Sequence, residues 1–227
     1  MLDLPAIYAE YGESWLPQML WACVGTLRLS AVSFLLAVLL GLVGALGRTS
    51  PQPLLRGLAI GYIEVCRGLP ALVILYIVYY VPPQLFPGAK WLALSAFFAA
   101  VIGLGLQGGA VLAEVFRSGI EALHRGQTEA ALSLGMTPIK TMAYIILPQA
   151  VRIVLPPVGN YAIGLLKDTS VCALIAAPEL MLRAKDLASS DFQPMAVFVL
   201  AAALYFAMSY PLSLGVRWME ARLGHGR

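Results

Sequence analysis

Apolar stretches, each long enough to cross a membrane, dominate the pattern of the chain. A transmembrane helix needs about 20 mostly apolar residues, and polar or proline-containing segments separate five stretches of about that length. The predicted spans are Leu20–Leu46, Leu58–Val81, Trp91–Val115, Ile153–Ala177 and Met195–Val216. The pattern therefore predicts an all-α integral membrane protein with five transmembrane helices, spanning residues 20–216, without a separate soluble domain.

The composition agrees with this prediction, because 60% of the 227 residues are hydrophobic and only 12% are charged, against roughly 25% charged in soluble domains. Residues 1–19 carry Asp3, Glu10 and Glu13, and no Lys or Arg precedes Arg28. The chain thus lacks the basic region of a cleaved signal peptide. We expect residues 1–19 to be retained as a short external segment at the membrane interface, with a disordered tail as the alternative.

The placement of basic residues predicts the orientation. Cytoplasmic loops carry an excess of Lys and Arg, and if five spans alternate, most basic residues fall on one side. That side holds Arg48, Arg56, Arg117, Arg125, Lys140, Arg152, Arg217, Arg222 and Arg227, and the opposite loops hold Lys90, Arg183 and Lys185. We therefore expect the N-terminus outside, and residues 117–152 and the tail 217–227 in the cytoplasm. The loop 178–194 is expected outside.

The sequence shows no catalytic or metal-binding pattern. Cys23, Cys66 and Cys172 lie inside apolar spans and form no CxxC pair, which is typical of small buried apolar residues. His124 and His225 stand alone in predicted cytoplasmic segments, and HExxH, GxSxG and Gly-rich phosphate loops are missing. The basic residues are scattered at helix ends, which argues against a nucleic-acid partner. These features predict a non-catalytic chain.

Residues 117–152, between the third and fourth spans, are too polar to cross a membrane but have the composition of folded helix. The run that begins at Glu129 consists of good helix formers and ends at Gly135, a residue preferred at a left-handed helix end. We expect a positive φ at Gly135 and a sharp turn of the chain there.

A second short helix is predicted immediately after this turn. Thr137 followed by Pro138 is a helix-start signal, and the helix should reach about Ile146 before Leu147-Pro148 ends it. A protruding pair of helices joined by a glycine elbow is suited to docking into a groove of another protein. A connecting or re-entrant loop is the alternative on physical grounds.

Residues 129–148, EAALSLGMTPIKTMAYIILP, resemble the EAA loop of ABC importer permeases. The family pattern is Glu-Ala-Ala, three residues, Gly, nine residues, Ile, one residue and Leu-Pro, and every fixed position is met. The segments 62–73, 106–127 and 159–171 are similar to the polar-amino-acid branch of the family, which includes histidine, glutamine, arginine and opine permeases. The resemblance extends from about Thr26 to Leu214.

This resemblance implies a type I importer fold with five helices per subunit, in the cell inner membrane. It implies a complex of two permease subunits, either two copies or two paralogues, with two ABC ATPase subunits and a periplasmic amino-acid-binding protein. The complex would move a polar amino acid inward. ATP and Mg would be bound by the partner ATPase, and this chain would hold no cofactor of its own.

The resemblance also implies that the EAA helix sits in a cleft of the ATPase and carries its closure to the membrane helices. The candidate ATPase-coupling residues are Glu129, Ala130, Ala131, Gly135, Leu147 and Pro148.

Charged side chains inside the predicted spans are candidate substrate ligands, because a charge near the bilayer centre costs at least about 2.5 kcal/mol. Each of the second and fourth spans places an acid and a base on one helix face, and an amino acid needs partners for both its carboxylate and its ammonium. In the family, a pocket has been associated with charged residues of these two helices. The candidate substrate-binding residues are Glu64, Arg67, Asn160, Lys167, Asp168 and Ser170.

Two alternatives stay open. The charges could neutralise one another and fix the helix register, since Glu64 lies roughly 9 Å and Lys167 roughly 21 Å from the cytoplasmic side at about 1.5 Å per residue. The chain could also be a stand-alone secondary transporter or channel, although no inverted repeat is visible. Glu114 and Arg117, three residues apart at the end of the third span, are expected to form an ordinary interfacial pair.

Overall fold

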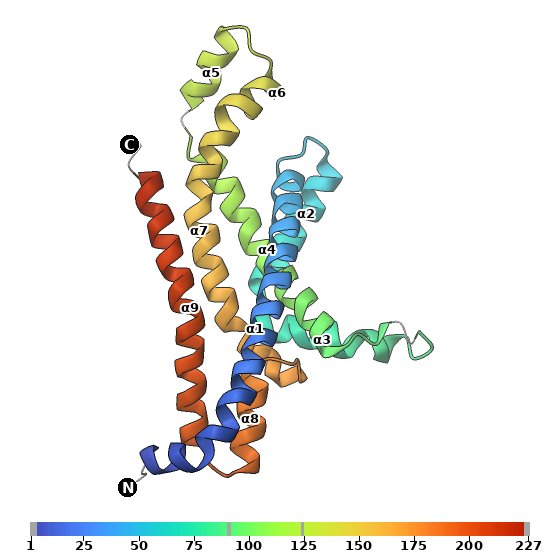
Figure 1. The fold of residues 1–227 in the computed structure, drawn as a ribbon. Helices are drawn as coiled ribbons and strands as arrows, with labels where there is room; N and C mark the ends of the chain where they lie inside the picture. Colours follow the sequence, from blue (N-terminus) through green and yellow to red (C-terminus); the bar gives the residue numbers. More distant parts are fainter. Residues whose placement is uncertain (1–3, 90–91, 124, 225–227) are drawn as a thin grey trace.

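A computed structural model describes residues 4–89, 92–123 and 125–224 (Figure 1). Predictions that involve Asp3, Lys90, Trp91, His124, His225 and Arg227 lie outside the described residues. The long helices are α1 (Leu4–Arg48), α4 (Ala96–Glu121), α7 (Leu147–Asp168) and α9 (Pro194–Gly224). The shorter elements are α2 (Pro53–Gly68), α3 (Ala71–Leu85), α5 (Arg125–Ser133), α6 (Pro138–Thr141), the π-helical turn η2 (Met142–Ile146), the 3₁₀-helix η3 (Thr169–Ile175) and α8 (Leu180–Ser190).

The prediction of an all-α membrane fold is confirmed. Within the described residues, four helical stretches are long and apolar enough to cross a membrane, and α2 with α3 would supply a fifth span as a bent pair. The start of α1 and the end of α9 lie at opposite ends of the bundle, and α5 and α6 project beyond the end at which α9 terminates (Figure 1).

The prediction of one continuous helix over Leu58–Val81 is wrong. The chain bends by 108° between α2 and α3, so that α3 leaves the bundle sideways (Figure 1). Pro70 is the cause, because proline disfavours the helical conformation of the residue before it, and Leu69 is extended with φ −99° and ψ 141°. Pro70 then serves as the N-cap of α3.

The described part of residues 1–19 belongs to one helix with the first span. α1 runs through this boundary, and its N-terminal portion packs on the connection between α8 and α9. Trp15 is fully buried, and its indole Nε1 donates a hydrogen bond to Asp191 Oδ2 at 2.6 Å. The Tyr8 hydroxyl donates to the Ala196 carbonyl at 2.8 Å, and Tyr11 stacks on Trp15 with ring centroids 5.2 Å apart. Trp15 is therefore a core residue, and Tyr8 and Tyr11 pack against the same core while partly exposed.

The predicted helix end at Leu147-Pro148 is also wrong. Leu147 is helical with φ −60° and ψ −43°, and its N–H donates to the carbonyl of Met142 in a π-helical turn. Pro148 occupies the first turn of α7, where a missing N–H leaves no helical hydrogen bond unmade. The chain therefore remains helical from Pro138 to Ile175.

The segment 178–194, predicted as a loop, contains α8. Buried Glu179 caps this helix by accepting hydrogen bonds from the backbone N–H groups of Leu182 at 2.6 Å and Met181 at 2.9 Å. The Tyr205 hydroxyl of α9 donates to the same carboxylate at 2.5 Å. Burial raises the pKa of Glu179, and the hydrogen bond from Tyr205 acts against that rise. The cap thus ties α8 to α9.

Candidate functional site

The elbow, defined as residues 125–146, has the predicted helix–glycine–helix structure. Gly135 has a φ of 80°, which confirms the expected positive dihedral. Its N–H donates to the carbonyl of Leu132 at 2.9 Å, and the N–H of Met136 donates to the carbonyl of Ala131 at 3.1 Å. These two bonds form a Schellman motif. Thr137 caps α6 through its side-chain oxygen, so that two helices turn sharply around Gly135.

Large apolar side chains cover the outer surface of the elbow. Leu134, Ile139 and Tyr144 are 84%, 82% and 72% exposed, although they lie on a segment too polar to be surrounded by lipid. Exposed apolar side chains on a segment outside the membrane are candidates for an interaction surface. Of the six residues predicted to couple to an ATPase, Ala131 is buried inside the elbow, and Glu129, Ala130, Gly135, Leu147 and Pro148 are at least partly exposed.

One polar side chain, Gln149 of α7, links the elbow to the membrane helices through two hydrogen bonds. The Gln149 side-chain Nε2 donates to Gln127 Oε1 at 2.6 Å and to the carbonyl of Ile145 at 2.8 Å. A hollow of about 610 Å³ lies between the elbow and the end of α4, and Thr141 lines it. Within the described structure the buried Thr141 hydroxyl has no hydrogen-bond partner. The elbow thus rests on few contacts apart from its continuous helical connection into α7.

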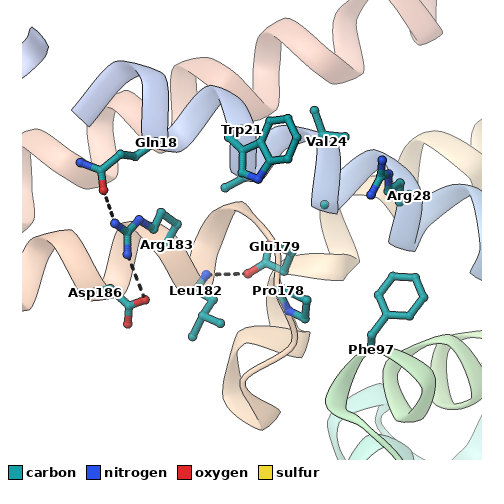
Figure 2. A pocket seen from close by; sticks show the side chains of 12 residues that line it. Gln18, Trp21, Val24, Arg28, Phe97, Pro178, Glu179, Leu182, Arg183 and Asp186 are labelled. Atoms are coloured by element: carbon teal, nitrogen blue, oxygen red, sulfur yellow. Dashed lines mark hydrogen bonds and ion pairs between the residues drawn. The ribbon is translucent and has the colours of Figure 1, made fainter. Parts of the chain in front are cut away.

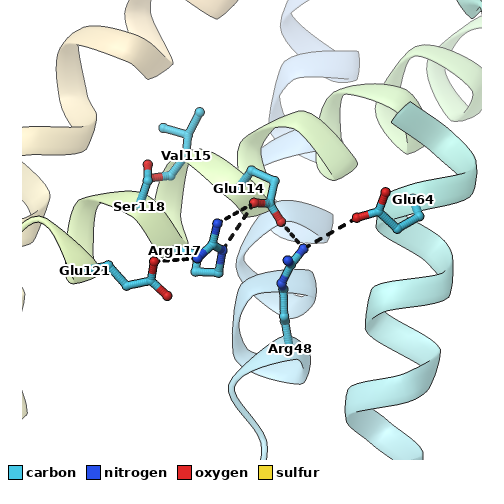
Figure 3. Close-up of polar contacts among 7 residues, drawn as sticks. All are labelled: Arg48, Glu64, Glu114, Val115, Arg117, Ser118 and Glu121. Carbon is cyan, nitrogen blue, oxygen red and sulfur yellow. Dashed lines mark hydrogen bonds and ion pairs between the residues drawn. The ribbon is translucent and has the colours of Figure 1, made fainter. Parts of the chain in front are cut away.

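A cluster of charged side chains joins α1, α2 and α4 at the end of the bundle that carries the elbow (Figure 3). Arg48 at the end of α1 pairs with Glu114 of α4, and its Nη1 lies 4.0 Å from Glu64 Oε1 on α2. Arg117 pairs with Glu114 at 2.8 Å, as predicted, and also with Glu121. The Glu114 side chain is only 19% exposed and Glu64 is 63% exposed. The pair with Glu114 is therefore better shielded from solvent than the looser contact with Glu64.

The structure divides the predicted substrate-binding residues into separate groups. Glu64 contacts Arg48 rather than Arg67, and Asn160 Nδ2 donates to Glu220 Oε1 on α9 at 3.3 Å. Lys167 and Asp168 are exposed at the end of α7. Neither side chain makes a hydrogen bond or ion pair with any other residue that the structure describes, and the same holds for exposed Arg67. Ser170 is half-buried in η3, two residues after Asp168.

Lys167, Asp168 and Ser170 lie where a long helix changes its geometry. α7 ends at Asp168 and continues as η3, which ends at Ile175 and is capped by Ala176 with a left-handed φ of 56°. α3, which follows the break after Arg67, packs against η3 in a cluster that includes Leu75 and Cys172. Interrupted backbone at membrane depth is tolerated where it is buried in protein or lines a cavity. The break between α2 and α3 and the change from α7 to η3 therefore lie in one region of the fold.

Two tyrosines that sequence reasoning did not single out hold α2 and α7 against α4. The Tyr62 hydroxyl donates to the carbonyl of Leu106 at 2.7 Å. A Cβ at Gly108 would lie 2.1 Å from the Tyr161 hydroxyl, and one at Gly109 would lie 2.5 Å from the Tyr62 hydroxyl. The adjacent glycines in a predicted span were the available signal, but their partners depend on the tertiary fold. The partners of Arg48, Glu179 and Glu220 likewise could not be predicted from the sequence.

Comparisons with known proteins agree with this architecture. The family described as "Binding-protein-dependent transport system inner membrane component" matches residues 34–225. The probable amino-acid ABC transporter permease protein YckA of Bacillus subtilis is 40% identical over 88% of this chain and 86% of its own length. The probable amino-acid ABC transporter permease protein PatM of Vibrio harveyi is 37% identical over 98% and 94%. The chain belongs to the family of binding-protein-dependent transport system inner membrane components.

Solved structures extend the comparison to the fold. A crystal structure of an amino acid ABC transporter with histidines matches 98% of this chain and 99% of its own chain, with a TM-score of 0.88 and 33% identity. An inward-facing structure of the MetNI methionine ABC transporter has a TM-score of 0.68 at 18% identity, over 88% of this chain and 95% of its own, and shows likeness of fold alone. The type I importer fold is thereby confirmed, and the chain is an amino-acid ABC transporter permease subunit.

Proposed function

We propose that this permease subunit receives a polar amino acid from a periplasmic binding protein and passes it across the cell inner membrane. Transport is driven by ATP hydrolysis on a partner ABC ATPase, which binds the ATP and Mg. A second permease subunit completes the path. The observation that carries this proposal is the elbow, which presents exposed apolar side chains beyond one end of the membrane helices.

The elbow would couple this chain to the ATPase. Leu134 and Ile139 flank the turn at Gly135, and full burial of such a side chain stabilises an interface by about 1.5–3 kcal/mol. The π-helical turn η2 continues the elbow into α7 without a flexible linker. Movement of the docked elbow is thereby passed to the helix that ends at Lys167 and Asp168. Glu129, Ala130, Gly135, Leu147 and Pro148 remain the proposed coupling surface, with Ala131 as internal support.

The substrate would bind near the break at the end of α7. Asp168 would contact the substrate ammonium and Lys167 or Arg67 its carboxylate, because these charges lack ion-pair partners among the described residues. Ser170 adds a hydroxyl. Glu64 and Asn160 are also proposed to bind substrate. In this structure Glu64 contacts Arg48 and Asn160 contacts Glu220, so each would exchange its present partner for substrate. A solute without charged groups would leave Asp168 and Lys167 or Arg67 uncompensated. A zwitterion supplies one group of each sign, which favours it as the substrate.

The orientation follows from the placement of basic residues and has a direct test. In a variant without the native cysteines, Lys140→Cys should react with an impermeant maleimide only after the membrane is opened. Ser189→Cys at the end of α8 should react in intact cells, because α8 is proposed to face outward. Labelling of Lys140→Cys from outside intact cells would overturn the orientation.

The whole proposal is tested by amino-acid uptake into vesicles that hold the reconstituted complex, which must stop when ATP hydrolysis is blocked.

A further inference from the structure

The connection between α8 and α9, residues 191–193, presents an aromatic side chain at the end of the bundle opposite the elbow (Figure 1). Phe192 is 86% exposed, more than any other large apolar side chain that the structure describes. The connection precedes the fifth predicted span, which begins at Met195, and in the proposed orientation it lies on the external side. Single exposed apolar side chains are common on proteins, so exposure alone assigns no role to this ring.

The backbone at Phe192 is strained. Its φ is 54°, and Ala176 is the only other residue besides glycine with a positive φ in the described part of the chain. Asp191 is the C-cap of α8, so Phe192 stands at the next position, where a left-handed residue is usually glycine or asparagine. A bulky side chain is unfavourable in this conformation. Such strain persists where the surroundings hold it, and it is concentrated at functional sites.

Hydrogen bonds on both sides hold the strained residue in place. The Asp191 N–H donates to the Leu187 carbonyl at 3.0 Å, and Asp191 Oδ2 accepts from the indole of fully buried Trp15 at 2.6 Å. The Gln193 carbonyl accepts a hydrogen bond from the backbone of α9 at 3.1 Å. The ring of Phe192 is thus presented by a fixed backbone, which reduces the conformational entropy lost when a partner binds it.

Acidic side chains predominate on the elements around this connection. In residues 4–19 of α1, in α8 and in the connection, four carboxylates stand against two basic groups: Glu10, Glu13, Asp186 and Asp191 against Arg183 and Lys185. Arg183 donates to Gln18 of α1 and lies 3.8 Å from Asp186 (Figure 2), so its charge is compensated locally. This acidic balance disfavours anionic lipid head groups and favours a soluble partner with basic groups around an apolar pocket.

We propose that Phe192 is an anchor by which this chain binds the periplasmic amino-acid-binding protein. The inference rests on the proposed function, in which that protein delivers the substrate. The phenyl ring enters an apolar pocket of the binding protein, and the acidic side chains around it face basic groups at the rim of that pocket. Aromatic side chains are enriched in the buried centre of protein interfaces and contribute much of their binding energy. This use of the ring accounts for a phenylalanine at a position that suits glycine.

The test is ATP hydrolysis by the permease–ATPase complex in lipid nanodiscs, measured as the substrate-loaded binding protein is titrated. Phe192→Ala keeps the strained backbone and removes the ring, so it should weaken the apparent affinity for the binding protein about tenfold or more. Phe192→Gly should weaken it equally, but should raise the melting temperature of the complex by about 2–4 °C because it relieves the strain. A merely structural phenylalanine would instead lower the melting temperature when replaced by glycine. Phe192→Tyr should keep most of the affinity.

Phe206→Ala is the matched control, because Phe206 is also well exposed, at 64%, but lies in the middle of α9, where a soluble protein does not reach it. It should keep the wild-type affinity for the binding protein. Equal affinity of the wild type and both Phe192 variants would overturn this inference alone. Failure of the binding protein to stimulate the wild type would contradict the proposed function itself.

A fluorescent label separates the binding protein from the membrane as the partner of this position. In a variant without the native cysteines, bimane on Phe192→Cys should change its emission when the loaded binding protein is added. Nitroxide-labelled lipid in the nanodisc should not quench it beforehand. Strong quenching by the labelled lipid, with no change on addition of the binding protein, would place the side chain in the leaflet and overturn the proposal.

Discussion

Gly135→Ala is expected to reduce both ATPase association and transport by about 5- to 30-fold while the protein remains in the membrane at the wild-type level. The φ of 80° at this position is left-handed, and a residue with a Cβ pays roughly 1–2 kcal/mol there, which corresponds to that factor in population. Apart from Gly135 itself and its two chain neighbours, no heavy atom of the described residues lies within 4 Å of the position that a Cβ would occupy. The effect would thus come from the backbone alone, through loss of the turn that sets the angle between α5 and α6.

Gly126→Ala provides the control for this experiment. Gly126 lies in the same elbow and also has open space where an alanine Cβ would lie, but its φ is not positive. Alanine is a better helix former than glycine, so this variant should associate with the ATPase at least as well as the wild type. Co-purification of the ATPase and uptake by the complex are the two measurements. Wild-type association and uptake by Gly135→Ala would refute a docking role for the turn.

Asp168→Asn is expected to lower substrate-stimulated transport about tenfold or more, because hydrogen bonds to charged groups contribute roughly 1.5–3 kcal/mol. The change keeps the size of the side chain and removes only its charge. Asp168 has no ion-pair partner among the described residues, so the melting temperature and basal ATP hydrolysis of the complex should persist. Uptake at several substrate concentrations, beside the melting temperature, measures both effects.

The double variant Asp168→Asn with Lys167→Gln separates binding from charge neutralisation. If the two charges only compensate each other, Asp168→Asn alone should be destabilising by a few kcal/mol, and the double variant should recover stability and transport. If they bind substrate, the double variant should remain stable and transport poorly. Normal transport by the double variant would show that these charges are not a substrate site.

Local signals explain why the elbow was predictable. Gly135 and the Thr137-Pro138 pair act through the conformations of their own backbone, so the turn and the start of α6 could be placed from sequence. The Leu147-Pro148 signal failed because a π-helical turn accommodates a proline in the first turn of α7. The bend before Pro70 was missed because average hydropathy is insensitive to a single proline within an apolar stretch.

The partners of charged residues were predictable only where they lie on one helix. Glu114 and Arg117 are three residues apart on α4 and pair as expected. Glu64 and Arg67 have the same spacing on α2, but Arg48 from α1 approaches Glu64 instead. Asn160 similarly contacts Glu220, which is distant in sequence. Such contacts depend on how the helices pack, and the spacing of residues along one helix does not contain that information.

The central claim is that this chain transports an amino acid only as part of an ATP-driven complex. The most direct measurement is uptake of labelled basic, acidic and amide amino acids into vesicles that contain the permease, its ATPase and the binding protein. Uptake should require ATP on the ATPase side, should stop when hydrolysis is blocked, and should be selective for one class of amino acid. Uptake that continues on an ion gradient with ATP hydrolysis blocked would contradict the claim and indicate a stand-alone transporter.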